Sequence, residues 1–394
     1  MRPLPWRRQT DATERQRIAL TGPDVLADLL KQDDASASEG FDFYSDNAAG
    51  VHPRILEALV ACNRGFVPPY GMERFTRRID SAFSEVFERE CFVFPVPTGT
   101  AANGLALGAL APPHGLIFAH RNAHIVTTEC GAPEFFTLGA RLALLEGPHN
   151  KLAASTFESA LHGHARRTVH QLLPAAVSLT QATERGTVYA LEEIAAISGL
   201  AHAAGLKVQM DGARFANAMV SLDATPAEMS WKAGVDAVSF GATKNGTMNA
   251  DAVVLFDAEL AEKARFMHKR AGFLHSKMRF MSAQLLAYLE DGLWVANARA
   301  ANANAERLAA ALASVKGVEL NDPVQANELF PRLPADFQRR LKSEGIHLRD
   351  WPDAKGDLFR IVTSYCDGEA RIGAFEKVCR EFGGGEANAT RSGG

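Results

Sequence analysis

One lysine lies in a small, polar turn between two apolar runs that are typical of strands. It is Lys244, within VSFGATKNGTMNADAVVLFD, residues 238–257. The simplest interpretation is a solvated surface lysine, which is the commonest environment of this residue type. The small neighbours GAT and NGT instead favour a side chain directed into a confined site, where desolvation would lower the pKa of the amine and make it nucleophilic.

A carboxylate and a guanidinium follow another apolar run. In LKVQMDGARFANA, Asp211 ends the predicted strand and Arg214 comes three residues later. An aspartate in this position often only caps a helix or belongs to a loop. Placed together at a strand end, however, the two side chains suit a site that holds a cationic ring nitrogen and a carboxylate or phenolate oxygen.

A third feature is a predicted strand, turn and helix in FPVPTGTAANGLAL. The backbone N–H groups of Gly99, Thr100 and Ala101 would point outward at the helix start, where the helix dipole favours an anion such as phosphate. The alternative is that Thr98 or Thr100 merely caps the helix. The segment matches neither G-x-G-x-x-G nor G-x-x-x-x-G-K-[ST], so it supports neither a dinucleotide fold nor a nucleotide-phosphate loop.

These three features together meet the needs of pyridoxal 5'-phosphate (PLP). This cofactor requires a phosphate cradle, a carboxylate that keeps its pyridine nitrogen protonated, and a lysine for covalent attachment. His124, in HRNAHIVTTECGAPEF, could stack on the cofactor ring, although a structural role is commoner for such a histidine and His120 competes for the position. The histidines and acids show no metal-ligand spacing such as H-x-x-x-H, so no metal site is predicted.

An alternating series of elements would position these groups. Between residues 41 and about 260, amphipathic helical stretches separate short apolar runs: CFVFPV, GLIFAH, AAVSLTQ, KVQMDGA, DAVSFGA and AVVLFD. This alternation predicts an α/β fold with a large, mostly parallel sheet between layers of helices. In such a sheet, reactive groups collect at the carboxyl ends of the strands.

The 394 residues divide into four predicted parts. Residues 1–40 form an N-terminal extension, and residues 41–275 form the large cofactor-binding domain. Residues 276–384 form a smaller α+β domain that begins in an Ala-rich helical block (280–313) and contains strands near GVEL and LFRIVTSY. Residues 385–394 are predicted to be a disordered tail.

Composition restricts the class of protein. A net charge of -4 without a basic stripe argues against nucleic-acid binding. No run approaches the roughly 20 apolar residues that cross a bilayer, and the first residues lack the apolar core of a signal peptide. The five cysteines show no paired spacing, which favours reduced thiols. We therefore expect a cytoplasmic protein that acts on small molecules.

The motifs, taken in order, resemble the threonine aldolase branch of the fold type I (aspartate-aminotransferase-like) PLP enzymes, which is grouped with the β-eliminating lyases. The resemblance runs from about Phe43 to Phe382 and rests on seven segments: YSDNAAGVHPRILEAL, PPYGMERFTRRI, PTGTAANGLAL, NAHIVTTECGAPEF, MDGARFANA, SFGATKNG and FRIVTSY. It implies cleavage of β-hydroxy-α-amino acids, such as L-threonine, L-allo-threonine or L-phenylserine, to glycine and an aldehyde.

The resemblance also implies roles for residues at matching positions. Lys244 would hold PLP, Asp211 would pair with the pyridine nitrogen, and His124 would stack on the ring. Gly99 and Thr100 would contribute to the phosphate site. His124 could be the base that takes the β-hydroxyl proton, directly or through water, and the sequence leaves the identity of this base open.

Further implied contacts concern the substrate and a neighbouring subunit. Ser45 and Arg360 would bind the substrate carboxylate, Arg214 would lie beside it and the phenolate oxygen, and the substrate site would also include Tyr70 and Glu129. Arg360 has independent support, because a bidentate guanidinium is a good carboxylate ligand, although it could instead form a surface ion pair. In SKMRFMSAQ, Arg279 is the candidate phosphate ligand from a neighbouring subunit of a homodimer or homotetramer.

One segment departs from the resemblance. SLTQATERGTVY replaces the L-E-N-T-H-N segment of many relatives, so the choice between threonine and phenylserine stays open. The same cofactor apparatus could also serve a β-eliminating lyase or an amino-acid racemase. A non-catalytic binding module is a third alternative, and it is disfavoured because the lysine is present.

Overall fold

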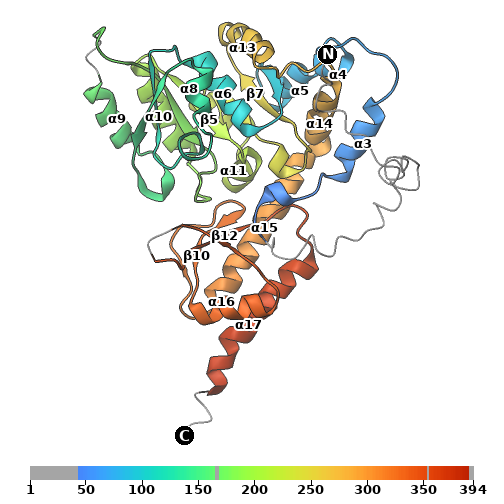
Figure 1. Cartoon of the computed structure of the whole chain (residues 1–394), viewed down its shortest axis with the longest axis vertical. Coiled ribbons are helices and arrows are strands. Elements are labelled where there is room, and N and C mark those ends of the chain that lie inside the picture. The colour runs from blue at the N-terminus through green and yellow to red at the C-terminus, as the bar shows by residue number, and fades with distance from the viewer. Residues whose placement is uncertain (1–42, 165–167, 353–354, 390–394) are drawn as a thin grey trace, which may run out of the picture.

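A computed structural model describes residues 43–164, 168–352 and 355–389, which form a large and a small unit (Figure 1). The large unit contains a seven-stranded sheet covered by helices, and the small unit lies below it in Figure 1. Helix α15 (Leu293–Ala313) runs from one unit into the other. The predicted α/β class is confirmed. The predicted N-terminal extension, residues 1–40, lies outside the described residues.

The seven-stranded sheet has the order β1-β7-β6-β5-β4-β2-β3. Strands β6, β5, β4, β2 and β3 are parallel, whereas β7 runs antiparallel to both β6 and β1, so the sheet is mostly parallel as predicted. The bounds are β1 (Phe92–Val96), β2 (Gly115–His120), β3 (Arg141–Leu145), β4 (Leu173–Thr180), β5 (Lys207–Gly212), β6 (Ala237–Phe240) and β7 (Asp251–Leu255). Only edge strand β3 has no counterpart among the six predicted runs.

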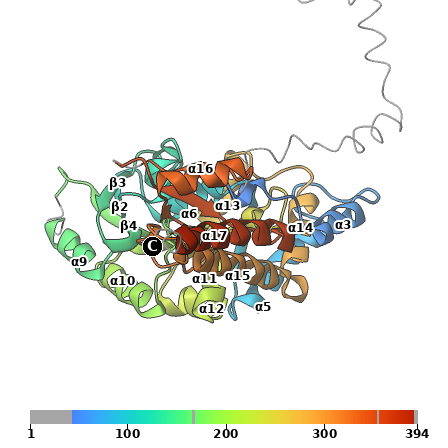
Figure 2. The same ribbon diagram turned by 90° about the horizontal axis from the view of Figure 1, so that it is seen from below.

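Helices cover both faces of this sheet because alternate strand residues point to opposite sides. Phe118 belongs to one hydrophobic cluster and its neighbour Ile117 to the other. Helices α6 (Gly99–Leu110) and α13 (Ala258–Arg270) cover one face, and α5 (Ile79–Val86), α10 (Leu191–Ala203) and α11 (Phe215–Leu222) lie on the other (Figure 2). The sheet is therefore buried on both sides, and its carboxyl edge is the place where polar side chains gather.

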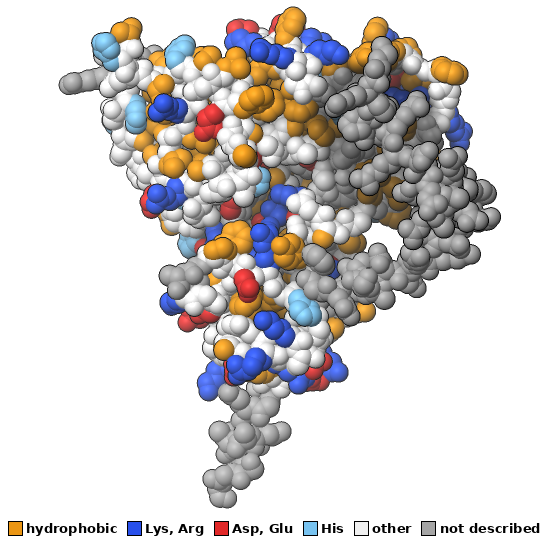
Figure 3. Space-filling view, viewed as in Figure 1, with side chains coloured by type: hydrophobic (Ala, Val, Ile, Leu, Met, Phe, Trp, Pro, Cys, Tyr) orange, Lys and Arg blue, Asp and Glu red, His pale blue; other side chains and the backbone are white. Residues whose placement is uncertain are grey.

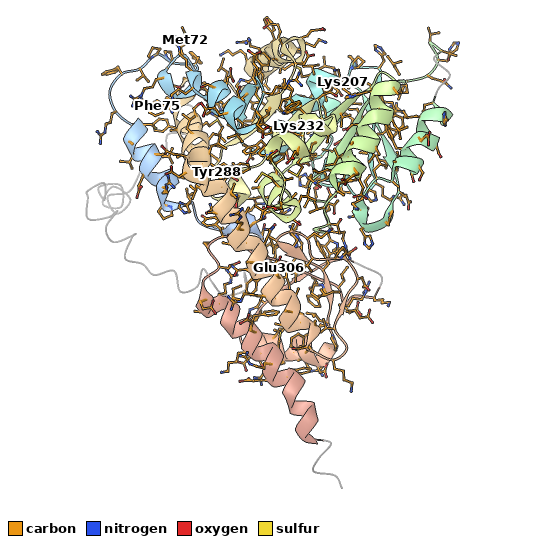
Figure 4. All side chains as sticks on the ribbon, turned by 180° about the vertical axis from the view of Figure 1, so that it is seen from behind. Met72, Phe75, Lys207, Lys232, Tyr288 and Glu306 are labelled. Atoms are coloured by element: carbon orange, nitrogen blue, oxygen red, sulfur yellow. The ribbon has the colours of Figure 1, made fainter. Side chains whose placement is uncertain are left out.

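The helical block predicted for residues 280–313 is two helices rather than one. Helix α14 (Arg279–Leu289) ends before a turn in which Asp291 has φ 51° and Gly292 has φ 67°, and α15 begins at Leu293. Helix α14 packs against α3 (Pro53–Cys62) and α4 (Arg74–Arg77) of the large unit. Figure 4 shows Tyr288 on α14 within the large unit and Glu306 on α15 beside the small unit.

The small unit has its own hydrophobic cluster, which includes Ala305, Leu308, Phe337, Ile361 and Phe375. Because this cluster takes in α15 only from Ala305 onward, the change from one unit to the other falls within α15 and not at the predicted residue 276. The other elements of this unit are β8 (Glu319–Leu320), β9 (Glu328–Leu329), β10 (Pro331–Arg332), α16 (Ala335–Ser343), β11 (Arg349–Asp350), β12 (Phe359–Val362) and α17 (Glu369–Ala389).

The end of the chain differs from its prediction. Helix α17 continues to Ala389, five residues into the segment that was predicted to be disordered, and residues 390–394 lie outside the described residues. None of the helices in the described ranges has both the length and the hydropathy needed to cross a membrane.

Candidate active site

A cavity of about 310 Å³ opens at the carboxyl edge of the large sheet. Its wall is built from the segments that follow five strands: Gly99 and Thr100 after β1, His124 after β2, Glu184 after β4, Asp211 and Arg214 around the end of β5, and Lys244 after β6. The parallel strands explain this convergence, because their carboxyl ends meet at one edge. Residues that are far apart in the sequence therefore surround one space.

Lys244 lies in the short helix η5 (Thr243–Asn245), directly after β6. The Oδ1 atom of Asp251 holds this turn, because it accepts hydrogen bonds from the backbone N–H groups of Ala242 at 2.8 Å and Thr243 at 2.9 Å. The Asn245 side chain anchors the other end by donating to Tyr288 Oη at 2.7 Å. Burial lowers the pKa of the Lys244 amine, and the nearby Arg214 guanidinium lowers it further. The amine is thus held in a fixed turn and is easier to deprotonate than a surface lysine.

Asp211 is only 2% exposed and sits at the floor of the cavity. Its Oδ2 accepts from Asn103 Nδ2 at 2.8 Å, and its Oδ1 accepts from the backbone N–H of Ala213 at 3.1 Å. Asn103 also donates to Glu129 Oε1 at 2.8 Å, and its own Oδ1 accepts from Gln209 Nε2 at 3.0 Å. Asn103 was not predicted from the sequence, although a polar residue within the apolar helix GTAANGLALGAL is a usable signal.

His124 is the first residue of helix α7 (His124–Thr127) and lines the cavity. Its Nδ1 lies 2.7 Å from Glu129 Oε1, and this hydrogen bond raises the pKa of His124. The competing His120 is buried elsewhere, with its Nε2 3.3 Å from the Gly147 carbonyl oxygen. Between these two histidines, only His124 belongs to the cavity wall.

His124, Glu129 and Asp211 bring one ligand atom each to within 4.8 Å of one another. Hydrogen bonds within the protein already engage these groups, since both carboxylates accept from Asn103 and Glu129 also contacts His124. We therefore interpret the three residues as a hydrogen-bond network under the cavity and assign no metal to them.

The start of helix α6 meets the cavity, but in a different way from the prediction. Thr98 is the N-cap, and its Oγ1 accepts from the backbone N–H of Ala101 at 3.1 Å. The Ala101 N–H is therefore used within the helix and does not point outward, which corrects that expectation. Gly99 and Thr100 remain at the cavity wall, and a Cβ added at Gly99 would meet no described atom within 4 Å. The N-cap and the open space at Gly99 thus coexist in one turn.

Four charged side chains form an alternating chain behind the cavity. Asp46 accepts from Arg214 Nε at 2.8 Å and Nη2 at 2.9 Å, while Arg214 Nη1 lies 2.9 Å from Glu328 Oε2. Glu328 Oε1 in turn accepts from Arg360 Nη2 at 2.6 Å and Nε at 3.0 Å. In Figure 3, lysine and arginine side chains gather in the region where the two units meet. Arg360 is thus paired with a buried carboxylate and not with a surface one.

Ser45 was predicted as a site residue, whereas its neighbour Asp46 was not. Ser45 Oγ accepts from the backbone N–H of Asn47 at 3.2 Å and so caps the short helix η2 (Asp46–Ala48). Asn47 reaches the cavity wall, which Ser45 does not. Asp46 and Glu328 carried no local signal, because their partners are distant in the sequence.

We predict that Asp46→Asn destabilises the protein by about 3 kcal/mol, because it removes one partner of a buried charge. Burial alone would raise the pKa of Asp46, but the charges of Arg214 and Lys244 and the hydrogen bonds from Arg214 and Asn327 together outweigh burial, and the pKa is lowered. Asp46 therefore stabilises the fold at neutral pH, and this contribution disappears as the pH falls through the lowered pKa. Urea unfolding at pH 7 measures the difference in free energy of unfolding between Asp46→Asn and the parent protein.

The matched control is Asp291→Asn, which breaks the exposed Arg54–Asp291 pair, in which the Asp291 side chain is 76% exposed. Exposed pairs contribute about 1 kcal/mol or less, so this variant should unfold almost like the parent. Equal losses of unfolding free energy in the two variants would show that the buried pair stabilises the fold no more than the exposed pair does.

Tyr70 and Arg279 do not reach the cavity of their own chain. Tyr70 is 48% exposed in the loop before α4, with Lys269 Nζ 4.5 Å above its ring. Arg279 opens α14, and its Nη1 donates to the Gly65 carbonyl oxygen at 3.3 Å. Figure 4 shows the adjacent Met72 and Phe75 at the outer edge of the large unit. Neither residue therefore takes part in the cavity that its own chain forms.

The donor and acceptor set fits PLP. The first turn of α6 has open space at Gly99, Asp211 offers a buried carboxylate, and Lys244 offers an amine of lowered pKa in the same cavity. A phosphate, a pyridine nitrogen and an aldehyde are the groups that match these three features.

Comparisons with known proteins agree with this geometry. The profile of the β-eliminating lyase family matches residues 42–333. A low-specificity L-threonine aldolase from Pseudomonas sp. is 40% identical over 331 residues, which cover 84% of this chain and 94% of that protein. A low-specificity L-threonine aldolase from Pseudomonas aeruginosa is 43% identical over 304 residues, which cover 77% and 87% respectively.

Solved structures give the same picture. Threonine aldolase from Leishmania major superposes with a TM-score of 0.80 at 29% identity, covering 87% of this chain and 99% of that one. An aspartate aminotransferase from Rhodobacter sphaeroides superposes with a TM-score of 0.59 at 18% identity, covering 87% and 93%, which shows the shared fold alone.

Proposed function

The chain belongs to the β-eliminating lyase family, and from this premise we propose that it cleaves β-hydroxy-α-amino acids of the L-threonine, L-allo-threonine or L-phenylserine type to glycine and an aldehyde. The observation that carries the proposal is the convergence of Lys244, Asp211 and the start of α6 on one cavity. Enzymes of this family depend on PLP, which when bound accepts the electrons of the Cα–Cβ bond that breaks.

The proposed cofactor site uses five residues of this chain. Lys244 provides the covalent attachment, and Asp211 lies where a carboxylate can keep the pyridine nitrogen protonated. The backbone N–H groups of Gly99 and Thr100 bind the phosphate, and the half-exposed imidazole of His124 is available to cover the ring. The turn at Gly99 and Thr100, Asp211 and Lys244 are the features that together predicted a PLP site from the sequence.

The proposed substrate site lies on the side of the small unit. Arg360 binds the substrate carboxylate with help from Ser45, the N-cap of the short helix that carries the wall residue Asn47. Arg214 lines the cavity, and Glu129 contributes through its hydrogen bond with the wall residue His124. Both hydrogen bonds from Arg360 to Glu328 use Nε and Nη2, so among the described residues Nη1 stays available for a carboxylate. Glu328 thereby orients the guanidinium without using all of its donors.

We predict that Arg360→Ala raises KM for L-threonine about 30-fold or more, which corresponds to losing at least about 2 kcal/mol of a charge-assisted contact. The effect on kcat should be smaller, because the contact exists both before and during the reaction. Steady-state kinetics at pH 8 separates the two constants. The control is Arg307→Ala, which breaks the ion pairs with Glu369 and Glu376 on α17. An unchanged KM in Arg360→Ala would mean that a group other than Arg360 binds the substrate carboxylate.

The assembly is proposed to be a homodimer or homotetramer with shared sites. The edge that carries Tyr70 and Arg279 also exposes large apolar side chains, namely Val60, Phe66, Val67 and Met72. A second subunit packed there would cover this surface and bring Tyr70 and Arg279 toward a neighbouring cavity. We also propose that the protein acts in the cytoplasm, in keeping with five cysteines that are all unpaired.

Product analysis by proton NMR tests the proposed function. The PLP-loaded protein is incubated in turn with L-threonine, L-allo-threonine and threo-phenylserine. Glycine with acetaldehyde or benzaldehyde is expected, and the relative rates identify the preferred substrate. A keto acid with ammonia would instead indicate a β-eliminating lyase, and a racemised substrate would indicate a racemase on the same scaffold.

A further inference from the structure

The turn after strand β4 brings one more acid to the cavity. Glu184 lines its wall, and the residues around it are held in place. Gln181 and Tyr189 exchange two hydrogen bonds, from Gln181 Nε2 to the Tyr189 carbonyl oxygen at 3.0 Å and from the Tyr189 N–H to Gln181 Oε1 at 2.9 Å. Arg185 donates from Nε and Nη2 to Asp322 at 2.8 and 2.6 Å. The segment that departs from the family pattern therefore forms a fixed support for Glu184.

The two oxygens of the Glu184 carboxylate differ. Oε1 accepts from the backbone N–H of His124 at 2.6 Å. Oε2 is buried and has no hydrogen-bond partner among the described residues. A buried acceptor without a partner is costly in a folded protein, so its presence at a ligand cavity calls for a donor that the ligand supplies.

Burial, hydrogen bonds and neighbouring charges shift the pKa of Glu184 in opposite directions. Burial raises the pKa of Glu184 to about 7, and the negative charge of Asp211 contributes to the increase. Its hydrogen bond from His124 and the positive charges of His124 and Arg214 favour the ionised form. Tyr189, on the far side, stays neutral because burial raises its own pKa. A carboxylate that gains and loses its proton near neutral pH is well suited to general base catalysis.

We propose that Glu184 is the general base that accepts the β-hydroxyl proton of the substrate through Oε2. This inference rests on the proposed aldolase function. The proton passes from the hydroxyl to Oε2, the Cβ–O bond becomes the aldehyde carbonyl, and the Cα–Cβ bond breaks with its electron pair remaining on the glycine half. That half then takes up one proton at Cα, so no oxidant or co-reactant is needed.

The geometry favours Glu184 over His124 for this role. The Nδ1 of His124 is already engaged by Glu129, and its ring is available to cover the cofactor. Glu184 offers an unpaired acceptor from another wall of the same cavity. His124 then acts on Glu184 through its backbone N–H, which stabilises the ionised carboxylate.

The test compares Glu184→Gln with wild type on the PLP-loaded full chain. The variant keeps the shape of the side chain but cannot accept the proton at this position. Its kcat for L-threonine cleavage should fall about 100-fold or more, with KM within about 3-fold. The wild-type kcat/KM should rise with pH through about 7 as Glu184 ionises, and this limb should be absent in the variant.

Two further measurements separate this proposal from the proposed function. Exchange of the glycine α-proton with D2O needs no β-hydroxyl base, so Glu184→Gln should retain it within about 3-fold. In protein labelled with 13C at Glu Cδ, the signal that disappears in Glu184→Gln should titrate near pH 7 in wild type. The exposed neighbour Glu192→Gln serves as the control and should cleave threonine normally.

Several outcomes would overturn the proposal. These are cleavage by Glu184→Gln at more than a third of the wild-type rate, an equal loss of cleavage and glycine exchange, or a titration midpoint below pH 5. If Glu184→Gln does not fold, Glu184→Asp can assign the NMR signal, and the wild-type midpoint then decides. A wild-type protein that exchanges glycine but cleaves no β-hydroxy amino acid would refute the proposed function instead.

Discussion

Replacing Lys244 with alanine is expected to lower kcat/KM for L-threonine by at least about 1000-fold, because the variant loses both the covalent attachment point of PLP and a nitrogen that can carry protons. Among the described residues that line the cavity, Lys244 is the single lysine. The turn that holds it is fixed by Asp251 and Asn245.

Borohydride reduction followed by peptide mass analysis measures the attachment directly. In wild type, the cofactor mass should appear on the peptide that contains Lys244, and in Lys244→Ala it should appear on no peptide at comparable yield. Lys263→Ala is the control, since Lys263 is an exposed residue of α13 whose side chain is 55% accessible. Labelling of another lysine in wild type, or turnover retained by Lys244→Ala, would refute the assignment.

The sequence predicted those parts of the site that depend on strand ends. Lys244 and Asp211 each follow a short apolar run, and parallel strands bring such positions to one edge of the sheet. The strand GLIFAH coincides with β2, and KVQMDGA differs from β5 by a single residue. Local pattern is sufficient here because a strand that is buried on both faces is mostly apolar.

Local sequence pattern did not predict the residues whose partners are distant in the chain. Asp46 and Glu328 lie 282 positions apart, yet both bind the guanidinium of Arg214. Asn103 joins Asp211 and Glu129 because α6 packs against β5 and its neighbours in the sheet, an arrangement that no spacing along the chain encodes. Glu184 was contained in a segment already recognised as unusual, but its unpaired oxygen is a property of the folded cavity.

The differences between the predicted and the observed elements of the fold also have physical causes. Strand β3 is an edge strand whose residues are exposed or only partly buried, and its apolar run is limited to the four residues LALL. The break between α14 and α15 depends on the positive φ of Asp291, which helix propensity does not reveal. In the first turn of α6, the sequence does not reveal which backbone N–H group donates a hydrogen bond to Thr98 Oγ1.

Replacing Asp211 with asparagine is expected to lower kcat about 100- to 1000-fold, the usual effect of removing a preorganised charge from an active site. Asparagine has nearly the same shape and can still accept a hydrogen bond from Ala213 N–H or Asn103. It cannot carry the negative charge that keeps the pyridine nitrogen protonated. The variant should therefore bind PLP at Lys244 and yet react slowly, which distinguishes it from Lys244→Ala.

Two observations test this role for Asp211. Borohydride should still label the Lys244 peptide in Asp211→Asn, and single-turnover kinetics should place the loss in the chemical step and not in KM. A cofactor analogue methylated on the pyridine nitrogen carries a fixed positive charge, so it should restore part of the lost rate in the variant while giving wild type no gain. Asp223→Asn, at the exposed C-cap of α11, controls for the change of residue type. If Asp211→Asn keeps more than a tenth of wild-type kcat, or if the methylated analogue gives no rescue, then the carboxylate supports only the Asn103 network and another group must hold the ring nitrogen in its charged form.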